Sequence, residues 1–98
     1  MNERSERRRR VVVAGHQGQG EVVLEHVDDP DEGVREAVLG ALVRLDMLTD
    51  TQLQAAFTDP SGRVRRRAAV IAAERPRIEL LPLLLDDDPT VVEVAAWA

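Results

Sequence analysis

The 98-residue chain has no cysteine, no lysine and no tyrosine, and Phe57 and Trp97 are its only large rings. Without cysteine it cannot form a disulfide scaffold, a thiolate metal site or a cysteine nucleophile. With so few aromatic residues, a core must be built from Val, Leu, Ile and Ala, which suits packed helices better than a β-sandwich. The sequence also lacks an apolar run near the ~18 residues of a membrane span and the apolar region of a secretory signal. We therefore expect a cytoplasmic protein with no membrane partner.

The composition is that of a folded domain, with 44% hydrophobic and 32% charged residues. A chain of this length supports one core, so we expect a single domain over residues 1–98. The net charge of -5 conceals segregation: residues 1–10 carry five arginines and two acids, whereas residues 79–98 carry five acids and no basic residue. Such blocks either pair within the fold or form partner surfaces.

Asp-Pro pairs recur along the chain at spacings of 30 and 29 residues, and they are Asp29-Pro30, Asp59-Pro60 and Asp88-Pro89. Each pair follows a short apolar stretch and precedes a longer one, which predicts a helix, a turn and a second helix in three successive units. In this interpretation the Asp caps the free N–H groups of the second helix, and the Pro occupies its first turn. The helical spacing of apolar residues places Leu42 and Ile71 on inward stripes of two second helices.

The segments that carry this repeat resemble the short HEAT-like repeats of the phycobilin-lyase type, and they are Asp29-Pro30…Val34-Arg35, Asp59-Pro60…Val64-Arg65 and Asp88-Pro89…Ala95-Ala96-Trp97. The resemblance covers about residues 20–98. It implies an all-α fold, a short right-handed α-solenoid of stacked helical hairpins. It also implies that Arg35 and Arg65 are structural and reach the Asp of a neighbouring turn.

The expected layout is a lone N-terminal helix at about 4–17, followed by repeats at about 20–46, 50–75 and 77–98. The third repeat departs from the pattern, because Val92 stands where the first two repeats have arginine and the sequence stops at Ala98. We expect this repeat to be truncated, or the chain to be a fragment of a longer array.

Candidate catalytic and metal-binding patterns fail on their details. The acids around Asp28 and Asp29 have Leu39 or Gly40 where a calcium loop needs Glu, so they and residues 86–88 are interpreted as helix caps. The only histidines, His16 and His26, lack a third ligand in the sequence, and Ser5 and Ser61 stand beside helix starts. The glycines at 15, 18 and 20 lack the lysine of a phosphate loop and indicate a helix end with a left-handed cap at Gly18 or Gly20. We therefore expect no catalytic residue, no cofactor, no metal and no enzyme activity.

The candidate binding residues lie in outward rows of the second helices and in the arginine cluster, and they are Arg9, Glu36, Arg63, Arg66, Arg67, Val70, Glu93 and Trp97. They favour a non-catalytic protein–protein interaction or scaffold module with an unknown protein partner. The alternative is binding to a nucleic-acid backbone through residues 63–67 and 7–10. A pI near 5.0 and the lack of lysine and stacking aromatics weaken that alternative. Lyase-like chromophore handling, implied only by the resemblance, ranks third.

The last unit ends with apolar side chains that no later residue covers, and they are Leu80, Leu81, Leu84, Val91, Val94 and Trp97. Uncovered apolar patches mark interfaces, so we expect a homodimer through the C-terminal hairpin, most simply two-fold, with Trp97 buried by the partner. In the alternative interpretation, Trp97 packs within its own unit.

Overall fold

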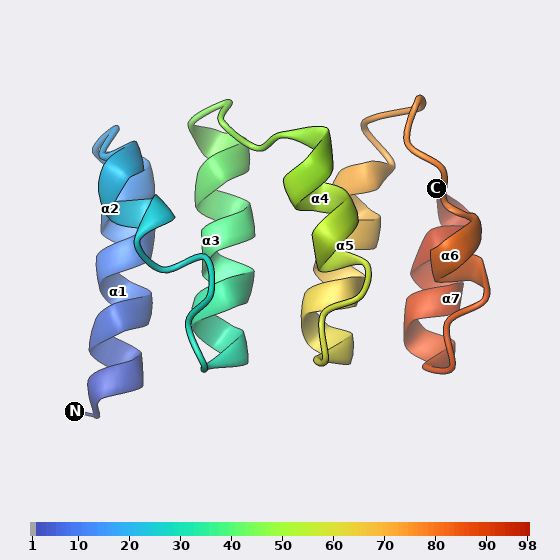
Figure 1. The fold of residues 1–98 in the computed structure, drawn as a ribbon, viewed down its shortest axis with the longest axis horizontal. Helices are drawn as coiled ribbons and strands as arrows, with labels where there is room; N and C mark the ends of the chain where they lie inside the picture. Colours follow the sequence, from blue (N-terminus) through green and yellow to red (C-terminus); the bar gives the residue numbers. More distant parts are fainter. Residues whose placement is uncertain (1) are drawn as a thin grey trace. The chain divides into compact units, whose positions relative to one another are not determined.

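The structure, a computed structural model, describes residues 2–98, and all regular elements in that range are α-helices (Figure 1). They are α1 (Glu3–His16), α2 (Gly20–Leu24), α3 (Glu32–Arg44), α4 (Asp50–Ala56), α5 (Gly62–Ala72), α6 (Leu81–Leu84) and α7 (Pro89–Trp97). The predicted all-α class is therefore confirmed. None of these helices is long and apolar enough to cross a membrane.

The helices form two compact units, the first ending at Leu48 and the second comprising Thr49–Ala98. In the first unit, α1 packs on α2 and α3, and α2 packs on α3. In the second unit, α5 packs on α4 and α7, and α6 packs on α7. The single domain with one continuous solenoid of hairpins stays a prediction.

The core of the first unit contains Val11, Val23, Val34 and Leu42, each at most 1% exposed. The helices α1 and α3 come very close together at Gly15, where an added Cβ would lie 2.8 Å from the Cβ of Ala41. A side chain at this position would push the two helices apart, so the close packing depends on glycine.

The core of the second unit consists of aliphatic side chains from α4, α5, α6 and α7. Leu53, Leu83 and Val91 are fully buried, and Val64 is 2% exposed. The two inward stripes expected from the periodicity are confirmed, because Leu42 is 1% exposed and Ile71 is 9% exposed.

The starts of the second helices differ from the predicted Asp-Pro caps. Asp31 caps α3 by accepting the N–H of Val34, and α5 begins after Ser61 with no side-chain cap bond. Only α7 has the expected arrangement, with Asp88 as the cap and Pro89 in the first turn. The prediction was therefore wrong for the first two Asp-Pro pairs, because one more residue, the N-cap, stands between the Pro and the first residue of the helix.

Three aspartates form the same tight turn before these helices, each accepting the N–H of the residue two positions later, and they are Asp29, Asp59 and Asp86. In the third unit the equivalent position is Asp86, two residues before the cap residue Asp88, whose own carboxylate accepts the N–H of Thr90 in the first turn of α7. This difference explains why the third Asp-Pro pair lies closer to its helix than the other two.

Two helices of the first unit end beside a residue with positive φ. After α1 this residue is Gly18 (φ 73°), as predicted, and after α3 it is Asp46 (φ 56°). Glycine adopts this conformation freely, whereas an aspartate there is strained.

Replacing Asp46 with Gly is expected to raise the free energy of unfolding by about 0.5 to 1 kcal/mol, because relief of the left-handed strain outweighs the added freedom of the unfolded chain. The matched control is Gly18→Ala, where a Cβ would meet nothing within 4 Å, so only its φ of 73° opposes the change. That control should lower the stability by about 1 kcal/mol. Urea unfolding of both variants checks this, and a loss of stability in Asp46→Gly would contradict it.

Candidate functional site

The Arg65 side chain joins two turns of the second unit. Its Nε and Nη2 donate to the carboxylate of Asp86 at 2.7 and 3.3 Å, and its Nη1 donates to the main-chain carbonyl of Asp59 at 2.7 Å. The Arg65 side chain is 14% exposed and that of Asp86 is 7% exposed. This confirms that Arg65 is structural and reaches the aspartate of a neighbouring turn.

An equivalent contact forms in the first unit between α1 and the turn before α3. The Nε and Nη2 of Arg7 donate to the carboxylate of Asp29 at 2.8 and 3.2 Å. The Nη1 of Arg35 donates to the main-chain carbonyl of the same aspartate at 2.8 Å. We call the Arg7–Asp29 and Arg65–Asp86 pairs the arginine clamps. Sequence reasoning placed Arg7 in a possible nucleic-acid surface, whereas here its guanidinium is engaged by Asp29.

Burial and the clamps act in opposite directions on the two clamped carboxyls. Burial disfavours the charged form of Asp86, but the N–H of Asp88 and the guanidinium of Arg65 outweigh it and lower the pKa of Asp86 below its ordinary value. The same balance holds at Asp29, where the hydrogen bonds from Arg7 and from the main chain outweigh burial and lower the pKa. The lowered pKa keeps both carboxyls in the ionised form that pairs with arginine.

Two further arginines of the second unit bind Asp50 at the start of α4. The Nη1 of Arg75 and the Nε of Arg77 lie 2.8 and 2.7 Å from its two carboxylate oxygens. The hydrogen bond from Arg77 is the largest influence on Asp50 and lowers the pKa of its carboxyl. These contacts tie the segment after α5 back to α4.

The structure places the eight candidate binding residues on two units. Arg9 on α1 and Glu36 on α3 belong to the first unit, and the other six belong to the second. Within the second unit, Arg66 on α5 donates to the hydroxyl of Thr90 on α7 at 2.8 Å and lies 3.7 Å from the carboxylate of Asp88. Arg66 is thus joined to α7, while the side chains of Arg63, Arg67, Val70 and Glu93 are exposed.

The α6–α7 hairpin carries an exposed apolar surface. Trp97 is 86% exposed, and Leu85, Leu81 and Leu84 are 74%, 52% and 40% exposed. The two helices run in opposite directions, so the start of α6 lies beside the end of α7 (Figure 1). We call Leu81, Leu84, Leu85 and Trp97 the C-terminal apolar surface.

This surface corrects two expectations from the sequence. The alternative in which Trp97 packs within its own unit is wrong, because the ring is 86% exposed. Val91, which was expected to be uncovered, is fully buried, whereas Leu85, which was not singled out, is 74% exposed. The sequence did offer a signal for the exposure of Leu85, because this residue directly precedes the acidic turn at residues 86–88.

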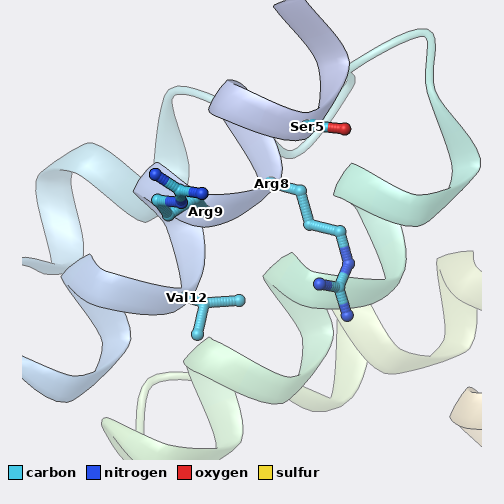
Figure 2. Close-up of a pocket in the computed structure, with 4 residues that line it drawn as sticks. All are labelled: Ser5, Arg8, Arg9 and Val12. Carbon is cyan, nitrogen blue, oxygen red and sulfur yellow. The ribbon is translucent and has the colours of Figure 1, made fainter. Parts of the chain in front are cut away.

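An open pocket of about 450 Å³ lies along α1, lined by Ser5, Arg8, Arg9 and Val12. Figure 2 shows these side chains on successive turns of α1, with the two guanidinium groups diverging. We call these four residues the arginine stripe. Arg9 was a predicted candidate and Arg8 belonged to the 7–10 run of the nucleic-acid alternative, but Ser5 and Val12 were missed, although spacings of three and four residues already place all four on one helix face.

Among the remaining chemical candidates, the aspartates cap helices, whereas Ser61 makes no side-chain cap bond and its buried hydroxyl has no hydrogen-bond partner within residues 2–98. Asp31 and Asp88 cap helices, which confirms the structural interpretation of the acidic clusters. His26 lies with its Nδ1 3.5 Å from a carboxylate oxygen of Asp29, and its buried Nε2 has no hydrogen-bond partner within residues 2–98. Over that same range, no three His, Asp or Glu side chains are grouped so that they could hold a metal ion.

No protein-family model matches the chain, and no curated protein or solved structure is significantly similar to it.

Proposed function

We propose that this chain is a non-catalytic protein-binding module of the HEAT-repeat type that binds its partner through the C-terminal apolar surface. The observation that carries the proposal is the exposure of Trp97, 86%, on a hairpin that also carries three exposed leucines. Burying an apolar side chain of this size stabilises a complex by about 1.5 to 3 kcal/mol, and contiguous apolar patches mark interaction sites. Tryptophan is also among the residues that contribute most to binding energy at interfaces.

Nucleic-acid binding has less support, because two arginines of the cluster in the second unit are bonded to groups of their own chain. Arg65 is held by Asp86 and Asp59, and Arg66 is held by Thr90 beside Asp88. Phosphate binding would have to compete with these contacts in a chain of net charge -5. Chromophore handling gains no support from the open, arginine-lined pocket on α1.

A capture experiment with the intact chain as bait tests the proposal. Trp97→Ala and Leu84→Glu are expected to lose a protein partner that the wild type retains, whereas the exposed-surface control Arg67→Ala should keep it, since Arg67 lies outside the C-terminal apolar surface. In parallel, binding to generic duplex DNA is measured against salt concentration. Micromolar DNA affinity at physiological salt, with a log-log salt slope that falls by about 1 for each of Arg63→Ala and Arg67→Ala, would reverse the ranking.

A further inference from the structure

The C-terminal apolar surface lies in the acidic end of the sequence. Residues 79–98 contain five acids and no basic residue. The side chain of Asp87 is 99% exposed, and Glu79 and Glu93 are also exposed. Glu93 precedes Trp97 by one helical turn on α7, so an acid flanks the exposed ring. A partner for this surface therefore needs both apolar contact area and positive charge.

The arginine stripe on α1 has both properties. Arg8 and Arg9 are exposed, and neither side chain has a hydrogen bond or ion pair with any residue that the structure describes. Val12, one turn further along the same face, is 37% exposed and contributes apolar area. The 450 Å³ pocket between these side chains is open to solvent, so an incoming side chain can enter it (Figure 2).

The charges decide which two surfaces meet. A two-fold contact between two C-terminal apolar surfaces brings two acidic surfaces against each other, and like charges at an interface are costly. A contact between the C-terminal apolar surface and the arginine stripe places acids opposite arginines instead. It also lets the Trp97 ring stack on a guanidinium group, an attractive arrangement for an arginine and an indole ring.

We infer that the C-terminal apolar surface of one copy docks on the arginine stripe of a second copy, with Trp97 between Arg8 and Arg9. This inference rests on the proposed function and names a second copy of the chain as one protein partner. The contact joins unlike surfaces, so a docked pair still offers one free C-terminal apolar surface on one copy and one free arginine stripe on the other. Association is therefore head-to-tail and continues beyond two copies, into a ring or an open chain, in contrast to a closed two-fold dimer.

Two variants separate the two surfaces. The tail variant combines Trp97→Ala with Leu85→Glu and keeps the arginine stripe, whereas the head variant combines Arg8→Glu with Arg9→Glu and keeps the C-terminal apolar surface. The charge-matched control for the head variant is Arg44→Glu with Arg67→Glu, which reverses two exposed arginines outside both surfaces. All these side chains are exposed, so the variants should fold, and circular dichroism verifies this.

Sedimentation velocity and light scattering measure the mass of the associated species from about 10 µM to about 1 mM. The range reaches high concentration because a contact between a few exposed side chains is expected to be weak. The wild type and the charge-matched control should exceed the monomer mass of 10.9 kDa increasingly with concentration and pass beyond a dimer. Salt should weaken the association, since it screens exposed charges. The tail variant and the head variant should each remain monomeric, and an equimolar mixture of them should form a complex of two chains and nothing larger.

Three results would overturn the inference: a monomeric wild type at every concentration, a head variant that dimerises by itself, or a mixture that stays monomeric. A head variant that dimerises while the tail variant does not would identify the two-fold arrangement. A monomeric wild type whose partner capture still depends on Trp97 would remove self-docking and leave the proposed function standing, so the two failures are distinguishable.

Discussion

Replacing Leu42 with Ala is expected to lower the free energy of unfolding by about 2 to 5 kcal/mol, because a fully buried leucine loses both its transfer free energy and its packing contacts. Leu42 is 1% exposed and lies on the face of α3 that forms the core of the first unit. The equivalent change in the second unit, Ile71→Ala, should cost about as much. Thermal and urea unfolding followed by circular dichroism measure both losses.

The chain supplies a matched control beside each of these residues. Val43 is adjacent to Leu42 and 45% exposed, and Val70 is adjacent to Ile71 and 53% exposed. Val43→Ala and Val70→Ala delete apolar groups from the same helices without opening a cavity, so each should change stability by less than about 0.5 kcal/mol. Equal effects at adjacent positions would mean that the helices are rotated from the register described above.

Replacing Arg65 with Met is expected to cost about 2 to 4 kcal/mol, because it removes the guanidinium donors from the carbonyl of Asp59 and from the part-buried carboxylate of Asp86, which keeps only the N–H of Asp88 among its described donors. The residual exposure of the pair, 14% for Arg65 and 7% for Asp86, allows water to recover part of the loss. The control is Arg67→Met, an exposed arginine two residues further along α5 whose side chain has no hydrogen bond or ion pair within residues 2–98. Removing both charges, in Arg65→Met with Asp86→Asn, should cost less than the sum of the two single changes.

The pH dependence of stability gives a second measurement on the same clamp. The pKa of Asp86 is lowered in the folded chain, so its contribution is complete above the unfolded-state pKa of about 4 and is lost as the pH falls through the folded-state pKa. Unfolding measured from about pH 6 to pH 2 should therefore show the wild type losing stability more steeply than Arg65→Met. Parallel curves for the two proteins would show that Arg65 does not hold the ionised form of Asp86.

The core could be predicted from the sequence because helical periodicity is a local signal. A spacing of three and four residues places Leu42 and Ile71 on inward faces without knowledge of any distant contact. The same reasoning was less accurate for the helix starts. The cap of α3 is Asp31, two residues after the predicted Asp29, because the Asp-Pro pattern does not distinguish a turn from a cap.

The site could be predicted only in part, since its contacts join residues far apart in the sequence. Arg7 and Asp29 are separated by 22 residues, and no local pattern distinguishes Arg7, which is clamped, from Arg8 and Arg9, which are exposed. The exposure of Trp97 likewise depends on how α6 and α7 pack. Composition and spacing predicted an apolar C-terminal hairpin, but the choice between a packed and an exposed ring required the fold.

The arginine clamp of the second unit also bears on how such a chain can grow by tandem duplication. Arg65 lies in one hairpin and Asp86, 21 residues later, in the turn of the next. The turn aspartates Asp59 and Asp86 mark equivalent positions, so residues 59–85 contain one acceptor and one donor. A second copy of that segment inserted after Leu85 would place a new aspartate 21 residues after Arg65 and a new arginine the same distance before the original Asp86. Both new junctions would then have an arginine and an aspartate at the spacing of the existing ion pair, so this duplication would need no compensating substitution at the pair.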